Sequence, residues 1–170
     1  MEEEWITIPG FVDYQVSNKG RVARLWSGRP KKVMTLTVNP HGTVYVGLSR
    51  NNIQRKRSVA LLVASAFLPK PESSHFNTPV HLDCNRSNNE VSNLAWRPKW
   101  FAPKYHEQVN KPYRSRINKP IVNLDTNKRF PNSLEAALCY GVLEQDVVRT
   151  AYNVEGYRSC FPTNHRFEVL

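Results

Sequence analysis

The polar stretch from His81 to Trp96 holds the residues best suited to chemistry. It contains one histidine, one aspartate and four asparagines within the 13 residues that start at His81. An imidazole gains and loses a proton near neutral pH, so a histidine held in a defined position can act in acid–base chemistry. A lone histidine is more often structural. The asparagines favour the catalytic interpretation here, because their amides bond to nearby backbone groups and fix loops.

Other chemistry finds less support in the sequence. His75, His81 and Cys84 could form part of a zinc site, but no fourth ligand follows at a standard spacing. The chain has no glycine-rich phosphate loop and no Ser-His-Asp arrangement that the sequence supports. The three cysteines, Cys84, Cys139 and Cys160, form no CxxC pair and no even disulfide framework, which favours a reducing compartment.

The elements around His81 must place it at the end of a strand. The natural arrangement is a strand that ends at His81, a loop pinned by asparagines, and a second strand that begins at Asn93-Leu94. Upstream, the apolar and alanine-rich run Val59–Phe67 predicts a buried helix, which the prolines that follow it stop.

Residues 1–50 predict short antiparallel strands. The strands are expected over Trp5–Ile8, Tyr14–Val16, Arg21–Leu25, Val33–Val38 and Val44–Leu48. Pro9-Gly10 is a turn signal between the first two. If the third strand is regular, Arg21 and Arg24 lie on opposite faces, so only one of them can point at a ligand.

The charge of the chain favours a polyanionic partner. The 170 residues include 24 Lys and Arg against 14 Asp and Glu, a net charge of +10. Clustered cations gain free energy by releasing counterions from phosphate backbones, although a merely soluble basic protein is the alternative. Residues 103–119 carry five basic and one acidic side chain and almost no apolar ones, so we expect an extended or partly helical linker there.

Composition excludes several classes of protein. Aromatic residues make up 11% of the chain, enough with the aliphatics to exclude disorder as the main state. The longest apolar run, Val59 to Leu68, is half of the roughly 20 residues that a membrane span needs. The acidic start of the chain shows no secretory signal.

The last 51 residues predict a small module with two helices. We expect a hairpin around Asp125–Lys128, then a helix that Ser133 caps and Gly141 ends, then a helix over Glu144–Tyr152. Helix, turn and helix is the outline of the helix-turn-helix motif. Three residues are expected on the outer side of the second helix, where base edges would be read or where the face is merely solvated: Gln145, Arg149 and Thr150.

Three motifs, in order along the chain, resemble those of the phage-type HNH homing endonucleases. The pattern His-x-Asp-x-Asn-x-x-Asn-Asn-x-x-x-Asn-Leu-x-Trp of residues 81–96 looks like the central motif of that family. Two further motifs are similar to the modules on either side of the nuclease: Trp5–Phe11 with Tyr14–Val22, and Lys119–Val122 with Ser133–Ala137. The resemblance covers nearly the whole chain.

The resemblance implies an α+β fold built as an elongated string of small modules. These are an N-terminal β DNA-binding module (1–50), a ββα-metal nuclease centre (51–102), a basic linker (103–119) and a C-terminal β-hairpin with a helix-turn-helix (120–170).

The resemblance also assigns roles at the nuclease centre. His81 takes the place of the general base that deprotonates the water attacking a phosphodiester, and Asn93 that of the residue that holds the loop and orients the histidine. A divalent cation would stabilise the developing charge. The family's ligand positions fall at Val80 and near Ala102, neither of which carries an oxygen donor. Asp83 should point away from the histidine.

Two further departures concern the same centre. Cys84 replaces the glycine usual at its place in the loop, which would disturb the turn. His106 lies one helical turn beyond Ala102 and would serve only after a register shift, which Pro103 opposes. We therefore expect no metal ligands and no cofactor, with Mg²⁺ or Mn²⁺ required only if nuclease activity is retained.

These observations support three hypotheses. The first is a site-specific double-stranded DNA-binding protein that has lost cleavage and acts as a repressor or roadblock. The second is an active HNH nuclease that nicks or cuts at a long site, and the third an RNA- or protein-binding accessory subunit. We expect a monomer without membrane or small-molecule partners, in the nucleoid of a bacterial or phage-infected cell, and thus cytoplasmic. The residues expected to contact DNA are Arg21, Arg24, Lys31, Lys32, Arg55, Lys56, Arg57, Lys111, Arg114, Arg116, Gln145, Arg149 and Thr150.

Overall fold

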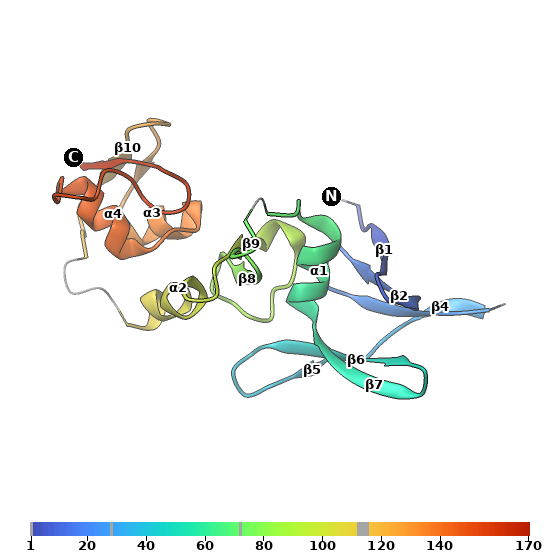
Figure 1. The fold of residues 1–170 in the computed structure, drawn as a ribbon. Coiled ribbons are helices and arrows are strands. Elements are labelled where there is room, and N and C mark those ends of the chain that lie inside the picture. The colour runs from blue at the N-terminus through green and yellow to red at the C-terminus, as the bar shows by residue number, and fades with distance from the viewer. Residues whose placement is uncertain (1, 28, 72, 112–115) are drawn as a thin grey trace. The chain divides into compact units, whose positions relative to one another are not determined.

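The chain folds into two compact units, Met1–Lys99 and Trp100–Leu170, each with its own hydrophobic core. The structure is a computed structural model that describes residues 2–27, 29–71, 73–111 and 116–170. Within these residues it is α+β, with several small antiparallel sheets and four α-helices (Figure 1). None of the helices in these ranges is long and apolar enough to cross a membrane.

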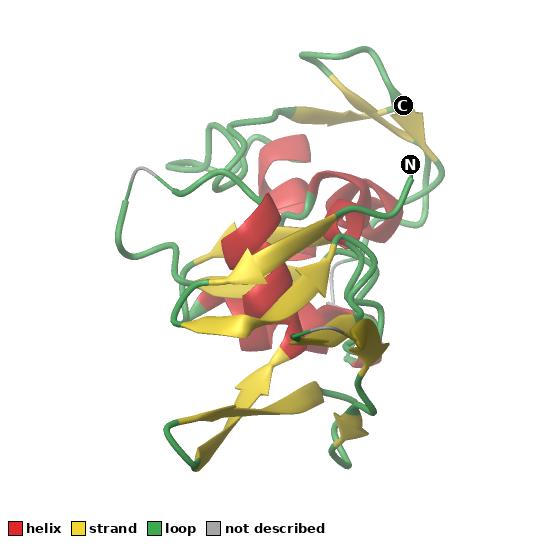
Figure 2. Ribbon diagram, turned by 90° about the vertical axis from the view of Figure 1, so that its right-hand side faces the viewer, coloured by secondary structure: helices red, strands yellow, loops and turns green. Residues whose placement is uncertain are grey.

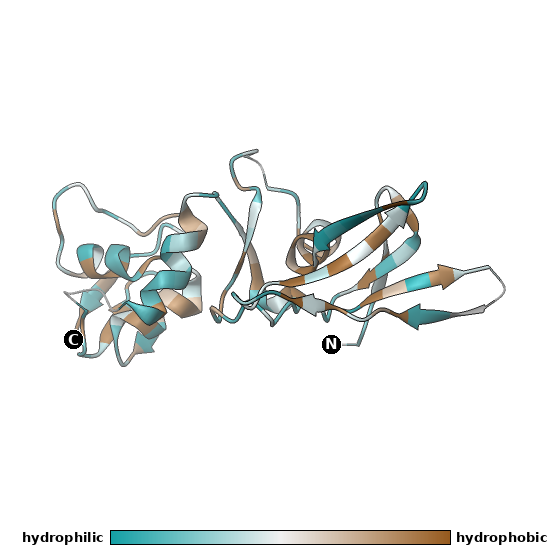
Figure 3. Cartoon of the chain, turned by 90° about the horizontal axis from the view of Figure 1, so that it is seen from below, coloured by the Kyte–Doolittle hydropathy of each residue, from teal (hydrophilic) through white to brown (hydrophobic). Residues whose placement is uncertain are grey.

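A four-stranded antiparallel sheet forms one side of the first unit. Its strands follow in sequence order and are β1 (Trp5–Ile8), β2 (Phe11–Ser17), β3 (Val22–Trp26) and β4 (Arg29–Val33). Gly10 has φ +79° in the turn between β1 and β2, a conformation that glycine adopts at little cost. Alternate side chains, among them Tyr14 and Val16, point into the core, as the bands of hydropathy along the strands illustrate (Figure 3).

A three-stranded sheet follows, made of β5 (Thr37–Val38), β6 (Val44–Arg50) and β7 (Ile53–Ser58). Arg50 pairs with Ile53, so Asn51 and Asn52 form a two-residue turn, and both have positive φ, as such hairpin turns require. The predicted hairpin of residues 33–48 is present with a shorter first strand, because Val33 pairs with Ala23 in the other sheet.

Helix α1 (Val59–Phe67) has the predicted bounds and contacts both sheets (Figure 2). Val59, Val63 and Ala64 are fully buried, so the apolar run of the sequence forms the centre of the first core. The hairpin of β8 (Thr78–His81) and β9 (Leu94–Arg97) also packs on α1, and a short 3₁₀ turn, Val91–Asn93, leads into β9.

The second unit begins with α2 (Phe101–Asn110), which occupies part of the range expected to be a linker. Strands β10 (Ile121–Asn123), β11 (Arg129–Phe130) and β12 (Phe167–Val169) form a small antiparallel sheet in the order β11-β10-β12. Helices α3 (Ser133–Tyr140) and α4 (Glu144–Ala151) pack against each other, and α4 also packs on β12. The predicted β10–β11 hairpin and both predicted helices are confirmed.

The start of α3 differs from the prediction. Asn132, not Ser133, caps the helix, because its side-chain oxygen accepts a 2.9 Å hydrogen bond from the Glu135 backbone N–H. Ser133 is buried, and its hydroxyl donates to Glu144 at 2.8 Å and accepts from the Ile117 N–H at 3.1 Å. The helix ends as predicted at Gly141, which has φ +62°.

Candidate functional site

His81 ends β8, and its side chain is buried against the loop that follows. Its Nε2 lies 3.0 Å from the side-chain oxygen of Asn89. The amide nitrogen of Asn89 donates to the Ser87 carbonyl at 3.2 Å, so the amide oxygen faces the imidazole. Nε2 therefore carries the proton and donates it to Asn89, which puts the basic lone pair of the neutral ring on Nδ1.

The surroundings of His81 favour the neutral ring. Burial lowers its pKa most strongly, and the nearby Arg86 lowers it further. The hydrogen bond with Asn89 and the charge of Asp83 raise the pKa but do not offset the burial. The net pKa lies below its usual value, so the imidazole is neutral at pH 7, the form that a general base needs.

Asp83 is the centre of the loop's hydrogen bonds. Its Oδ1 accepts from the Asn85 backbone N–H and from the Asn93 amide, each at 2.8 Å, and its Oδ2 accepts from the Asn88 amide at 2.8 Å. Partial burial raises the pKa of Asp83, but these bonds outweigh it and hold the pKa below its usual value. The carboxylate is thus ionised and committed to the shape of the loop.

Asn93 closes the loop from the other end. Its side-chain oxygen accepts from the Asp83 N–H at 3.0 Å, its amide donates to the Asn88 carbonyl at 2.8 Å, and its carbonyl accepts from the Leu82 N–H at 2.8 Å. The side-chain amide that bonds the imidazole at Nε2 belongs to Asn89. The sequence analysis missed this residue, although its place in the Asn88-Asn89 pair was the available signal.

The strands at the start of the chain support the same loop. The Val91 N–H donates to the Asn18 carbonyl at 2.8 Å. Gly20, with φ +75°, packs so closely on Asn89 that an added Cβ would lie 2.8 Å from the Asn89 Cβ. The turn at residues 17–20 therefore forms one wall of the histidine site and leaves room only for glycine.

Cys84 adopts the conformation of the glycine it replaces. Its φ is +60°, and its backbone N–H donates to the His81 carbonyl at 3.0 Å, so the turn forms with a cysteine in it. A left-handed conformation costs an ordinary residue about 1 kcal/mol. Burial raises the pKa of this thiol to about 11, so it is protonated at neutral pH.

The donor atoms around His81 do not fit the divalent cation that the resemblance implies. At the two ligand positions that the resemblance implies, Val80 is 1% exposed and pairs with Ala95, and the side chain of Ala102, which belongs to the second unit, carries no donor atom. Both carboxylate oxygens of Asp83 already accept hydrogen bonds from the loop. Among the described residues no three His, Cys, Asp or Glu side chains gather in a way that could hold a metal ion.

Five of the seven predicted contact residues of the first unit lie over aromatic rings. The Arg24 guanidinium lies 4.1 Å from the Trp26 ring centroid and 5.5 Å from that of Tyr14. Lys31 lies 3.9 Å from the centroid of Trp5. The other predicted contact residues of this unit show varied surroundings: Arg21 is ion-paired with Glu3, Lys32 and Arg55 are exposed, Lys56 lies over Tyr45, and Arg57 lies over Phe11.

The predicted contact residues of the second unit differ in accessibility. Arg116 is ion-paired with the buried Glu144, with its Nε 2.7 Å from Oε1. Thr150 is 4% exposed, and its hydroxyl donates to backbone carbonyls of its own helix, so it does not face outward as expected. Four further residues complete the set: Lys111 is exposed, Gln145 and Arg149 are half-buried, and Arg114 lies outside the described residues.

A strand that ends in a buried histidine, followed by an asparagine-pinned loop and a second strand, is the arrangement that the resemblance to the HNH endonucleases predicts. The sequence comparisons point the same way: the NUMOD4 motif matches residues 3–49, and both curated relatives described below are HNH endonucleases.

Two curated relatives come from Acanthamoeba polyphaga mimivirus, and both are uncharacterized HNH endonucleases. One is 25% identical over 146 residues, which cover 85% of this chain and 43% of the relative. The other is 37% identical over 86 residues, which cover 51% of this chain and 21% of the relative. The chain thus spans less than half the length of either relative.

A solved structure shares the fold. It is described as DNA binding and cleavage by the HNH homing endonuclease I-HmuI, and it matches 98% of both chains with a TM-score of 0.55 and 22% identity. This likeness shows that the α+β arrangement of small sheets and helices is that of I-HmuI over the full length of the chain.

Proposed function

We propose that this chain is a site-specific double-stranded DNA-binding protein in which the histidine loop is a scaffold rather than a nuclease centre. The observation that carries the proposal is the chemistry of the expected ligand positions: Val80 in the first unit and Ala102 in the second have no side-chain oxygen, and the Asp83 carboxylate is committed to the loop. DNA binding is supported by the net charge of +10 and by the likeness to a homing endonuclease that binds DNA.

In this proposal the chain keeps the modules of a homing endonuclease. Strands β8 and β9 of the first unit correspond to the two strands of a ββα-metal centre, and α3 and α4 to a helix-turn-helix whose second helix presents Gln145 and Arg149 to base edges. Several weak modules on one chain multiply affinity through effective concentration, so specificity needs no cleavage. A monomer bound in this way at a promoter or origin would act as a repressor or roadblock in the compartment that holds the DNA.

Cleavage and binding assays on one duplex test this function. Footprinting on genomic fragments gives the site, and the purified chain is then incubated with that duplex and Mg²⁺ or Mn²⁺. We expect a long asymmetric footprint and no nick. The double substitution Val80→Asp and Ala102→Asn restores the family's ligand types and is expected to restore nicking. Cleavage by the unmodified chain that disappears in His81→Ala would refute the proposal.

The second candidate is an active HNH nuclease with unconventional ligands. One observation favours it: His81 is neutral and held by Asn89 in the tautomer that leaves Nδ1 basic. The same incubation decides between the two candidates. Competition between duplex DNA and RNA of equal length tests the third hypothesis, an RNA- or protein-binding accessory subunit, and preference for the RNA would support it.

A further inference from the structure

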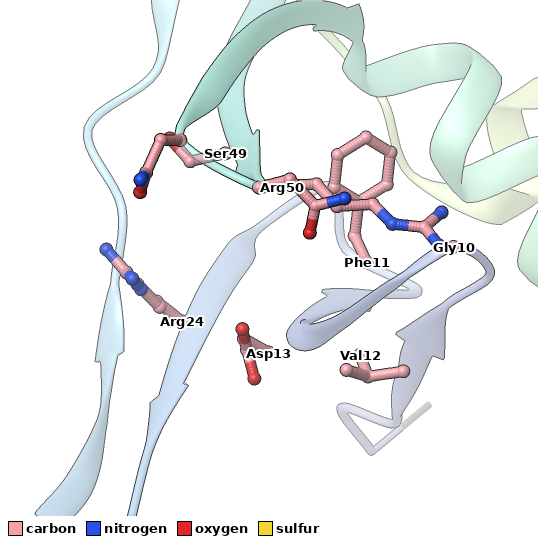
Figure 4. A pocket seen from close by; sticks show the side chains of 9 residues that line it. Gly10, Phe11, Val12, Asp13, Arg24, Ser49 and Arg50 are labelled. Carbon is pink, nitrogen blue, oxygen red and sulfur yellow. The ribbon is translucent and has the colours of Figure 1, made fainter.

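Two adjoining hollows lie in the first unit where the tips of two hairpins meet. The first, of about 380 Å³, is lined by residues 10–13 of the β1–β2 hairpin, by Arg24 of β3, and by residues 49–52 at the β6–β7 turn (Figure 4). The second, of about 410 Å³, shares Gly10, Phe11, Arg50 and Asn51 with the first. It extends along β7 to Arg55 and Arg57. We call the two together the arginine cavity.

A hydrogen bond joins the two hairpins at this cavity, and Arg50 lies between them. The Ser49 N–H donates to the Tyr14 hydroxyl at 3.2 Å, which ties the end of β6 to β2. Gly10 lies beside the Arg50 guanidinium: a Cβ added at Gly10 would be in ordinary van der Waals contact, 3.5 Å from Nη1. Arg50 thus extends across the tip of the β1–β2 hairpin, as Figure 4 also shows. The cavity is formed by the fold before any ligand arrives.

The lining is strongly cationic. Arg24, Arg50, Arg55 and Arg57 contribute four guanidinium groups, and Asp13 is the one acidic residue among the lining residues. None of the four forms an ion pair with an acidic side chain within the described residues. The charge of the cavity is therefore available to an external anion.

Arg24 carries a more specific signal. Its Nε is buried and has no hydrogen-bond partner among the described residues. Buried N–H groups are normally paired, because an unpaired one costs about 1–3 kcal/mol. The rings of Tyr14 and Trp26 hold the guanidinium in place, so the fork of N–H donors is fixed beside the cavity. An oxygen anion would satisfy these donors.

We propose that the arginine cavity is a phosphate-binding site that takes one or two consecutive phosphates of a DNA backbone. A guanidinium binds phosphate oxygens through two parallel hydrogen bonds, and the cavity offers such groups on both sides of Arg50. The assignment of the bound phosphate to a DNA backbone rests on the proposed function. It adds Arg50 and Asn51, which the sequence analysis did not single out, and gives Arg24 and Arg57 a common ligand.

The salt dependence of DNA binding tests the site in the full chain. Fluorescence anisotropy with a 30-base-pair duplex measures affinity as the salt concentration is raised. Arg50→Gln and Arg24→Gln are each expected to weaken binding about tenfold and to reduce the slope of log K against log salt by about 0.9. Lys70→Gln removes the same charge from an exposed position outside the cavity and is expected to change the slope far less. Thermal melts show that each variant is folded. Equal slopes in the cavity variants and the control would overturn the proposal.

Inorganic phosphate provides a readout that needs no DNA. In the full chain, the Nε–H resonance of Arg24 is expected to shift and saturate as phosphate is added, and this response should be lost in Arg50→Gln. If the chain has no affinity for duplex DNA, the proposed function fails, and a saturating shift still supports a phosphate site. Absence of any shift overturns the site itself. Tight binding of a mononucleotide with an unchanged duplex slope in Arg50→Gln would overturn its assignment to the DNA backbone.

Discussion

His81 couples the stability of the fold to pH through its burial. The ring is 4% exposed and its pKa is lowered, so the folded chain favours the neutral form while the unfolded chain titrates at about 6.5. Below that pH the unfolded state binds more protons than the folded state. The free energy of unfolding therefore falls as the pH drops from about 6.5 to the folded pKa and is unaffected by this residue above pH 7.

The substitution His81→Gln should remove this dependence. We expect the unfolding free energy of the wild-type chain to lose about 1.4 kcal/mol for each pH unit between the unfolded and the folded pKa. In His81→Gln that contribution should be absent. Urea unfolding at pH 7.5, 6.5 and 5.5 measures it, with His75→Gln at an exposed position as the control. Identical pH profiles for wild type and His81→Gln would contradict the burial argument.

For single residues, the sequence predicted which residue types build the histidine loop better than it predicted which of them bond to each other. The position of His81 at a strand end and the asparagine-pinned loop follow from composition, because asparagine amides stabilise loops wherever they occur. Which asparagine bonds the imidazole does not follow. All four carry the same amide, and the choice of Asn89 depends on its packing against Gly20, which is 69 residues away in sequence. Contacts of that range are set by tertiary structure, not by local pattern.

The helices of the second unit are joined by a buried polar network centred on Glu144. This carboxylate, 1% exposed, accepts from Arg116 through both oxygens and from the Ser133 hydroxyl, and its backbone N–H donates to Gln108. The network links α2, α3 and α4. The sequence analysis assigned Arg116 to DNA because a basic residue in a charged segment gives no sign of a buried partner 28 residues later. The helices themselves were predictable, since their apolar periodicity and the glycine at position 141 are local signals.

Breaking this network should destabilise the second unit. Glu144→Gln is expected to lower the free energy of unfolding by about 3 kcal/mol, because it leaves the Arg116 charge without its partner. The double variant Arg116→Met and Glu144→Leu should lose less, since no uncompensated charge remains. Urea unfolding measures both losses. The control is Glu107→Gln, which breaks the exposed ion pair with Lys111 and is expected to lower the free energy of unfolding by less than about 0.5 kcal/mol. A loss for Glu144→Gln no larger than that of the control would refute the structural role of the network.

At the scale of the whole molecule, the two units differ in net charge as well as having separate hydrophobic cores. The unit Met1–Lys99 carries 14 basic and 7 acidic side chains, and Trp100–Leu170 carries 10 and 7, so most of the positive charge belongs to the first. The predicted charge pattern pointed to residues 103–119, yet the arginine cavity lies in the first unit. Charge density along the chain does not indicate where strands from distant segments bring arginines together.

The two hydrophobic cores should respond separately to core mutations. Leu48 is fully buried in the first core and Ile121 in the second, and replacing either with alanine is expected to cost about 2–5 kcal/mol. Because no residue belongs to both of these clusters, Leu48→Ala should speed amide hydrogen exchange in β2, β6 and α1 and leave α3 and α4 unchanged, and Ile121→Ala should do the reverse. Exchange followed by mass spectrometry reads both units in one experiment. If either mutation speeds exchange equally in both, the chain unfolds as one cooperative body, and the description of its parts as separate binding modules is wrong.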